Sequence, residues 1–235
     1  MLAIFKREMR AYFTSPLGYV FIAVFLAANG FIFATSTIQE GTDSSVANYF
    51  TMLLFVFIIL VPLLTMRSLS EERKLKTEQL LLTSPVSLPG MVMGKFLSAF
   101  AMFAATYLVG CLNFYALYKF GTPSTARLFG YSISILLVGA AFVAIGIFMS
   151  SLTENQLIAA ISTMAVIAGF LVIGMLNSYI PFAWLRTVLD WISIYTRFGN
   201  FTYGIFDFSA VLYYASICFI FLFLTVRVYE KRRWE

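Results

Sequence analysis

The strongest constraint in this sequence is a set of six apolar segments that contain no Asp, Glu, Lys or Arg. A helix needs about 20 mostly apolar residues to cross the hydrocarbon core of a bilayer, and it satisfies its own backbone hydrogen bonds there. The sequence therefore predicts an all-α integral membrane protein with six transmembrane helices. The predicted spans cover residues 17–35, 50–66, 96–118, 129–152, 157–176 and 209–226.

The composition agrees with a single membrane domain over residues 1–235. Apolar residues make up 61% of the chain and charged residues only 11%, whereas soluble domains have about 25% charged residues. A soluble fold of this length would need charged side chains over most of its surface.

Basic residues predict the orientation, because Lys and Arg gather in cytoplasmic loops. With six spans both termini lie on one side, and that side carries 12 of the 16 basic residues. These twelve are Lys6, Arg7, Arg10, Arg67, Arg73, Lys74, Lys76, Lys95, Arg227, Lys231, Arg232 and Arg233. We therefore expect both termini in the cytoplasm, and the positive charge follows the membrane topology without a nucleic-acid partner.

The residues before the first span have the pattern of an amphipathic helix. One helical stripe is apolar, and the basic residues take the other side. The apolar stripe consists of Leu2, Phe5, Met9, Tyr12 and Phe13. The pattern favours a helix lying among membrane lipids, with a plain positively charged flank as the alternative.

The segment from Tyr179 to Phe208 is too polar to span the membrane simply, and it is dense in aromatic residues. Aromatic side chains favour the membrane interface. We expect short helices that lie on or dip into the outer leaflet, or an outer loop that rests on the headgroups.

The residues that carry chemistry in membrane enzymes and ion-coupled carriers are missing. The sequence has no histidine, and no acid lies inside a predicted span, so metal-dependent hydrolysis and proton relays lose their usual residues. Gly90 to Lys95 lacks the spacing of a phosphate-binding loop, and Phe96 stands where Ser or Thr is needed. We expect no catalytic residue, no metal site and no cofactor bound by this chain.

The richest polar stretch, residues 67–89, lies between the second and third predicted spans. The Ser-Glu-Glu run at 70–72 can start a helix, because a side-chain oxygen and acidic charges stabilise its first turn. Glu72 and Lys76 have the i, i+4 spacing of a stabilising ion pair. The pattern predicts an amphipathic helix over 71–82, which either docks onto a partner protein or belongs to a solvated loop.

Several separate groups of residues together resemble a known family. They are Phe5-Lys6-Arg7-Glu8, Tyr12 to Gly18, Glu71-Glu72-Arg73, Thr77, Leu80 to Ser87, Gly94-Lys95-Phe96, Ser150 to Gln156 and Arg232-Arg233-Trp234. Over essentially the whole chain they resemble the ABC-2 type exporter permeases, and among these the gliding-motility-associated permease subfamily. One departure is Lys76, where many members have Gly.

That resemblance implies the membrane half of an ATP-binding cassette exporter in the bacterial inner membrane. Two permease copies would work with two separate ATPase subunits, which bind ATP and Mg²⁺. It also allows an extracytoplasmic accessory subunit. The N-terminal segment would be a connecting helix, and the outer aromatic segment a pair of re-entrant helices.

The resemblance also assigns contact residues. A coupling helix would touch the ATPase through Glu71, Glu72, Thr77, Glu78, Leu81, Leu82 and Pro85. A second cytoplasmic contact would use Thr153, Glu154 and Asn155.

Small residues spaced by four let helices approach closely in lipid. Ala23 and Ala27 in the first span and Ala165 and Gly169 in the fifth have this spacing, and the resemblance places both spans at a homodimer interface. Packing within one subunit is the alternative.

Two other functions stay open at the level of sequence. A small secondary carrier would need polar groups near the bilayer centre, for which the spans offer little beyond Asn29 and Asn113. An accessory membrane anchor would need neither a substrate nor an ATPase.

Overall fold

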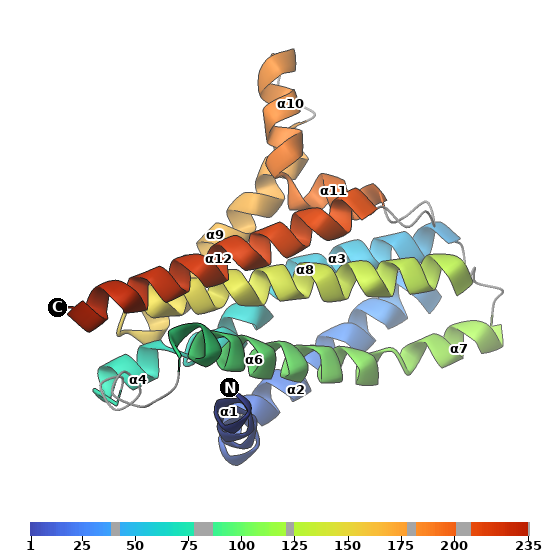
Figure 1. Ribbon diagram of the computed structural model, residues 1–235. Coiled ribbons are helices and arrows are strands. Elements are labelled where there is room, and N and C mark those ends of the chain that lie inside the picture. The colour runs from blue at the N-terminus through green and yellow to red at the C-terminus, as the bar shows by residue number, and fades with distance from the viewer. Residues whose placement is uncertain (39–42, 78–86, 121–124, 178–181, 201–207, 235) are drawn as a thin grey trace.

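The computed structural model describes residues 1–38, 43–77, 87–120, 125–177, 182–200 and 208–234. Within these ranges the ordered elements are all helices (Figure 1). Six of the helices are long and apolar enough to cross a membrane. The predictions of an all-α fold, of six spans and of a multi-pass membrane protein are therefore confirmed.

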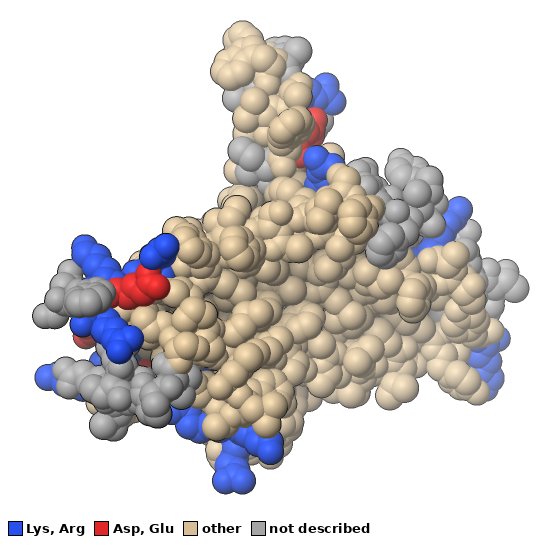
Figure 2. Space-filling model, in the orientation of Figure 1, with Lys and Arg blue, Asp and Glu red and all other residues tan. Residues whose placement is uncertain are grey.

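The elements follow one another as α1 (Leu2–Thr14), α2 (Pro16–Phe33), the π-helix η1 (Ala34–Ile38), α3 (Asp43–Thr65), α4 (Ser70–Lys74), α6 (Leu88–Gly110), α7 (Asn113–Phe120), α8 (Thr125–Leu152), α9 (Gln156–Leu176), α10 (Ala183–Ile192), α11 (Ile194–Asn200) and α12 (Phe208–Trp234). In the view of Figure 2, charged side chains gather at the two ends of the bundle, at its lower edge where α1 lies, and on the segment that carries α10, and the surface between these places shows no charged side chain. This is the surface that a bundle inside a bilayer needs.

Helix α8 lies at the centre of the bundle. It packs against α3, α6, α9 and α12, and Figure 1 shows it running alongside α12. The seven residues from Ala141 to Ile147 are all buried, which is two full turns of helix. A helix that is apolar and buried on every face belongs to the core.

Small residues let the neighbours of α8 approach closely. A Cβ atom added to Gly139 would lie 2.1 Å from the ring of Phe103 on α6, and one added to Gly146 would lie 2.2 Å from Thr65 Oγ1 on α3. Neither position has room for a side chain, so glycine at these two places sets the distance between α8 and its neighbours.

The third span differs from the continuous helix predicted over 96–118. It begins earlier, with Pro89 in the first turn of α6, and it is interrupted after Gly110 before α7 begins at Asn113. Proline fits a first turn because its missing N–H is not needed there. Gly110 and Asn113 are poor helix formers, and Asn113 Nδ2 donates to Asn29 Oδ1 at 3.2 Å across the break.

Helix α1 packs against α6. Ile4 is buried, and a Cβ atom added to Gly94 of α6 would lie 3.2 Å from the Ile4 side chain. Leu2 and Phe13 are exposed, as a lipid-facing stripe requires. Tyr12 departs from the predicted stripe, because its hydroxyl turns inward and donates to Leu64 O at 3.2 Å. The position of α1 among lipids stays a prediction.

In the aromatic segment predicted over 179–208, the described residues contain two short helices, α10 and α11. In Figure 1, α10 stands away from the bundle at a steep angle to the other helices. Trp184 and Trp191 are exposed on it, and the amide of Asn177 at the end of α9 donates to Asp190. Re-entry of this segment into the membrane stays a prediction.

Candidate functional site

The first residues of helix α4 are hydrogen-bonded to a serine hydroxyl of α8. The backbone N–H groups of Leu69 and Ser70 each donate to Ser150 Oγ at 3.1 Å, and Ser150 Oγ donates to Met66 O at 3.1 Å. The first N–H groups of a helix need acceptors from elsewhere. Ser150 supplies one from α8, and it is fully buried, so the start of α4 is fixed to the end of α8.

Helix α4 ends after a little more than one turn, in a Schellman motif. Thr77 N donates to Glu72 O at 3.0 Å and Lys76 N donates to Arg73 O at 3.1 Å, the two bonds that define this ending. Lys76 has a left-handed backbone with φ 56°. The continuous helix predicted over 71–82 is therefore wrong, because the backbone leaves the helical region at Lys76. The predicted i, i+4 contact with Glu72 is lost with it.

Four charged side chains from the three helices α1, α4 and α6 lie in contact with one another, and we call them the ion cluster. They are Arg7 and Glu8 of α1, Glu72 of α4 and Lys95 of α6. Lys95 Nζ lies 3.1 Å from Glu8 Oε1 and 2.9 Å from Glu72 Oε2. The Arg7 guanidinium contacts the same two carboxylates. Two positive charges therefore face two negative ones, and the ion cluster joins α1, α4 and α6.

Lys95 is the most buried member of the ion cluster. Its side chain is 1% exposed, against 15% for Glu8 and for Glu72, and it also donates to Ser68 O at 2.6 Å. An ammonium group persists in such a place only when it is paired and hydrogen-bonded. Lys95 is one of the basic residues counted for the predicted orientation, and the structure adds that its ammonium group is paired inside the protein and does not face solvent.

The charges of the ion cluster also govern the ionisation of Glu8. Burial by itself would raise the pKa of this carboxyl. Lys95 and Arg7 oppose it with their positive charges and hydrogen bonds, and the pKa of Glu8 ends below its usual value. Glu8 is therefore a carboxylate at neutral pH.

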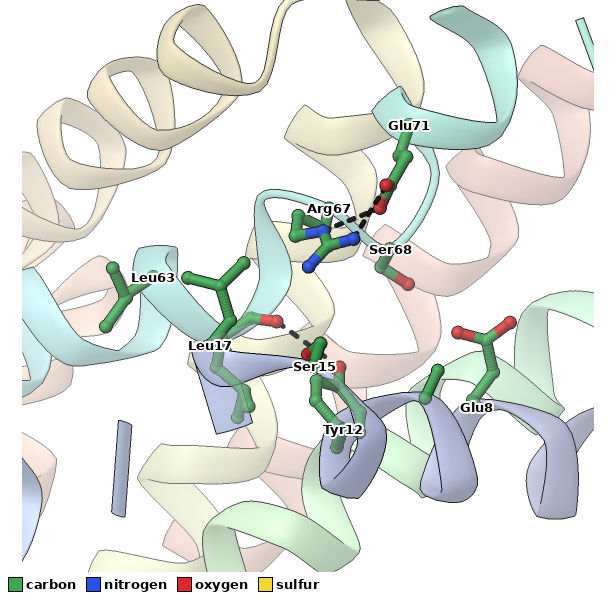
Figure 3. A pocket seen from close by; sticks show the side chains of 10 residues that line it. Glu8, Tyr12, Ser15, Leu17, Leu63, Arg67, Ser68 and Glu71 are labelled. Carbon is green, nitrogen blue, oxygen red and sulfur yellow. Dashed lines mark hydrogen bonds and ion pairs between the residues drawn. The ribbon is translucent and has the colours of Figure 1, made fainter. Parts of the chain in front are cut away.

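A cavity of about 70 Å³ lies beside the ion cluster, between α1 and the turn that leads into α4 (Figure 3). Its polar lining comes from Glu8, Tyr12, Ser15, Arg67, Ser68 and Glu71. Figure 3 shows Arg67 and Glu71 pointing toward each other, and two guanidinium nitrogens of Arg67 lie 2.6 Å from the Glu71 carboxylate. The space fits a few water molecules and is far smaller than the pockets that hold drug-sized ligands.

A second set of contacts ties α4 to the loop between α8 and α9. Arg73 Nε lies 2.9 Å from Glu154 Oε1, and Arg73 Nη1 donates to Leu152 O at 3.0 Å. Asn155 Oδ1 accepts from Leu157 N at 2.9 Å and so caps α9. Arg232 near the end of α12 donates to Ser151 O at 2.7 Å. Segments far apart in the sequence therefore meet at one end of the bundle, which we call the terminal end.

A comparison of the sequence with known protein families finds a match over most of the chain. Residues 23–229 match the family described as ABC-2 family transporter protein. The chain belongs to the ABC-2 family. It is thus a transmembrane permease component of an ABC transporter, a membrane component of a generally non-catalytic kind, and its family implies an ABC ATPase as partner. No curated protein matches the sequence.

The predicted ATPase-contact residues of this ABC-2 permease fall into three groups. Glu71 and Glu72 point inward, to Arg67 and to the ion cluster, so their charges are used within the permease. Thr77 is exposed. The remaining four lie outside the described residues, and they are Glu78, Leu81, Leu82 and Pro85.

The other predicted positions of the ABC-2 permease lie where a partner can reach them. Thr153, Glu154 and Asn155 form the turn between α8 and α9, and Glu154 is 60% exposed. Ala23 and Ala27 on α2 and Ala165 on α9 are exposed, and a Cβ atom added to Gly169 would meet no atom within 4 Å. Helix α3 packs against both α2 and α9. The dimer interface stays a prediction.

Sequence reasoning missed Lys95, Glu8 and Ser150 as members of the site. A signal for them was present, because Phe5 to Glu8, Glu71 to Arg73, Gly94 to Phe96 and Ser150 to Gln156 were singled out as separate motifs of the ABC-2 permeases. The structure brings side chains of all four motifs to the terminal end. That they occur together in one family was the clue that they meet in space.

Proposed function

We propose that this ABC-2 permease couples ATP hydrolysis by a separate ATPase to export, or to force transmission, across the inner membrane. The observation that carries the proposal is the ion cluster, in which a buried lysine ties α4 to α1 and α6. Helix α4 has no apolar anchor of its own among the core residues beyond the adjoining Leu69. Its position therefore depends on ionic and hydrogen-bond contacts with the spans.

Those contacts give a displaced α4 two routes into the bundle. One route runs through Glu72 and Lys95 to α6. The other runs through Arg73 and Ser150 to the end of α8, which is the central helix. Packed cores respond to a push by moving whole elements, so a partner that moves α4 will move spans with it. This is a mechanical role and needs no catalytic residue.

The assembly that we propose has two permease copies and two ATPase subunits, which bind ATP and Mg²⁺. The 12-to-4 division of basic residues supports cytoplasmic placement of the terminal end. The small residues on α2 and α9 support a homodimer. The resemblance of the sequence motifs is what supports the gliding-motility-associated subfamily, and α10 and α11 would be its outer re-entrant pair.

The cargo is proposed by chemical class only. The six predicted spans contain no charged residue, which suits a lipid-like or amphipathic cargo, or an output that is purely mechanical. A small, strongly charged solute would find no countercharge there.

The proposal is tested by purifying the tagged permease from its native membrane in mild detergent. We expect an ATPase subunit to accompany it and to hydrolyse Mg-ATP. Arg73→Glu, which breaks the contacts with Glu154 and Leu152, should lower the amount of ATPase retained per permease. Arg233→Ala at the exposed end of α12 serves as the control. A wild-type permease that retains no ATPase would refute the proposal.

A further inference from the structure

Helices α7 and α8 border a groove at the end of the bundle opposite α4 (Figure 1). Its volume is about 510 Å³, within the range of about 300–1,000 Å³ that is typical of sites for small molecules. Among the described residues, α8 packs closely against α6 but not against α7. The third span therefore leaves a space beside α8 once it has passed the break after Gly110, and we call this space the α7–α8 groove.

The lining of the α7–α8 groove is polar at its mouth and apolar further in. Thr125 is the first residue of α8 and Tyr118 lies near the end of α7, so both line the mouth. Phe114 and Leu128 lie about one helical turn deeper. Ser132 lies deeper still, but its hydroxyl already donates to Leu128 O at 2.8 Å. An amphiphile with a polar head and an apolar chain matches this order.

The inner wall of the groove is fixed by the core. The ring of Phe114 packs against three buried rings with centroids 5.8–6.4 Å apart, and they are those of Phe33, Tyr49 and Phe50. Leu128 is buried as well. These side chains have no freedom to turn into the groove and fill it. An apolar space does not hold water, so at membrane depth hydrocarbon fills it instead.

A positive charge stands at the mouth of the groove. Lys119 follows Tyr118 in the last turn of α7, and it is exposed. None of the ion pairs between side chains that the structure describes involves Lys119. Lysine and tyrosine at the end of a span lie at the level of the lipid headgroups. A ligand that carries both a negative charge and an apolar chain satisfies the mouth and the depth of the groove together.

We propose that the α7–α8 groove binds one anionic phospholipid, with an acyl chain against Phe114 and Phe129 and the phosphate at Lys119. The lipid comes from the leaflet at this end of the bundle. It joins α7 to α8 where the two helices do not pack closely on each other, and so it stabilises the outer part of the third span. The lipid site depends only on the membrane spans, and it adds a ligand to the proposed function without resting on it.

The test counts lipid molecules on the purified permease by native mass spectrometry, while phosphatidylglycerol or phosphatidylcholine with the same chains is titrated in detergent. We expect the wild type to bind one phosphatidylglycerol per chain, about 2- to 5-fold more tightly than phosphatidylcholine. Lys119→Glu should weaken phosphatidylglycerol binding by about 5- to 30-fold and remove the preference. Lys119→Arg should bind as the wild type does. Ala126→Trp places an indole in the groove and should weaken both lipids by about 10-fold or more.

Two variants are matched controls. Arg186→Glu reverses an exposed cation on α10, and Ala215→Trp adds an indole at an exposed position of α12; both should bind lipid as the wild type does. Loss in Lys119→Glu and in Ala126→Trp, with both controls unchanged, supports the lipid site. Wild-type lipid binding in either of those two variants overturns it, because the lipid then lies elsewhere on the bundle. A protein chain retained by the wild type and lost in Ala126→Trp, with no bound lipid, would also overturn it. Lys119 and Ala126 are exposed, so unfolding temperatures of all variants without added lipid should stay near that of the wild type.

Discussion

Replacing Lys95 by methionine should destabilise the terminal end more than any other single substitution among its charged residues. The change keeps an unbranched side chain of similar length and removes one charge. Glu8 and Glu72 would then share only Arg7, whose side chain is 51% exposed, and the ion cluster would carry one uncompensated negative charge. The hydrogen bond to Ser68 O would also be lost.

The size of the effect follows from burial. Breaking a fully buried ion pair costs about 3–5 kcal/mol. Because Glu8 and Glu72 are each 15% exposed, water screens part of the unpaired charge, and we expect a loss of about 2–4 kcal/mol. For a chain of this length that lowers the unfolding temperature by about 5–15 °C.

The assay is thermal unfolding of the purified permease in detergent, for Lys95→Met, Glu8→Gln and the double variant. The double variant leaves Arg7 facing Glu72, so neutrality is restored and at least half of the loss should be recovered. Arg10→Met, on the exposed side of α1, is the control for removing a positive charge. Unfolding of Lys95→Met at the wild-type temperature would refute the reasoning, as would a double variant less stable than either single one.

Three further predictions follow from the same geometry. The pKa of Glu8 is lowered in the folded chain. The stability that Glu8 adds to the fold is therefore complete above the unfolded pKa of about 4.3 and is lost as the pH falls through the lower folded pKa. The unfolding temperature of Glu8→Gln should depend less steeply on pH in that range than that of the wild type, and equal slopes would contradict this. In a variant without Cys111 and Cys218, cysteine at Ala27 or Ala165 should form cross-links between subunits, and monomers alone under oxidation would count against the dimer. Cysteine at exposed Lys74 should resist an impermeant thiol reagent added from outside, whereas cysteine at exposed Lys119 should react. Labelling at Lys74 from outside would contradict the predicted orientation.

The spans could be predicted from the sequence because hydrocarbon imposes one demand on every residue that meets it. Segments 129–152 and 157–176 agree with α8 and α9 to within a few residues. The third span was predicted less well, since hydropathy does not register where a helix is interrupted. At the break, Asn113 is hydrogen-bonded to Asn29, a residue more than eighty positions earlier.

The site was harder to predict because its contacts are non-local. Arg7 meets Glu72 across 65 positions and Lys95 meets Glu8 across 87, and no periodicity connects such residues. Glu72 had an apparent partner at the helical spacing, Lys76, and the turn at Lys76 removed it. The departure from glycine at this position was visible in the sequence, but its meaning required the backbone angle.

The burial of α8 on every face has a consequence for how this protein can diverge. From Ala141 to Ile147 the helix contacts only protein, so its side chains must fit the shapes of their neighbours and are not in contact with lipid. Changes in membrane thickness or lipid composition can be met by exchanging one apolar side chain for another on α2, α9 and α12, where many face outward. In α8 the same exchange needs a matching change across the contact, at Phe103 for Gly139 or at Thr65 for Gly146. Relatives adapted to different membranes should therefore differ freely at the rim and in coordinated pairs at the centre.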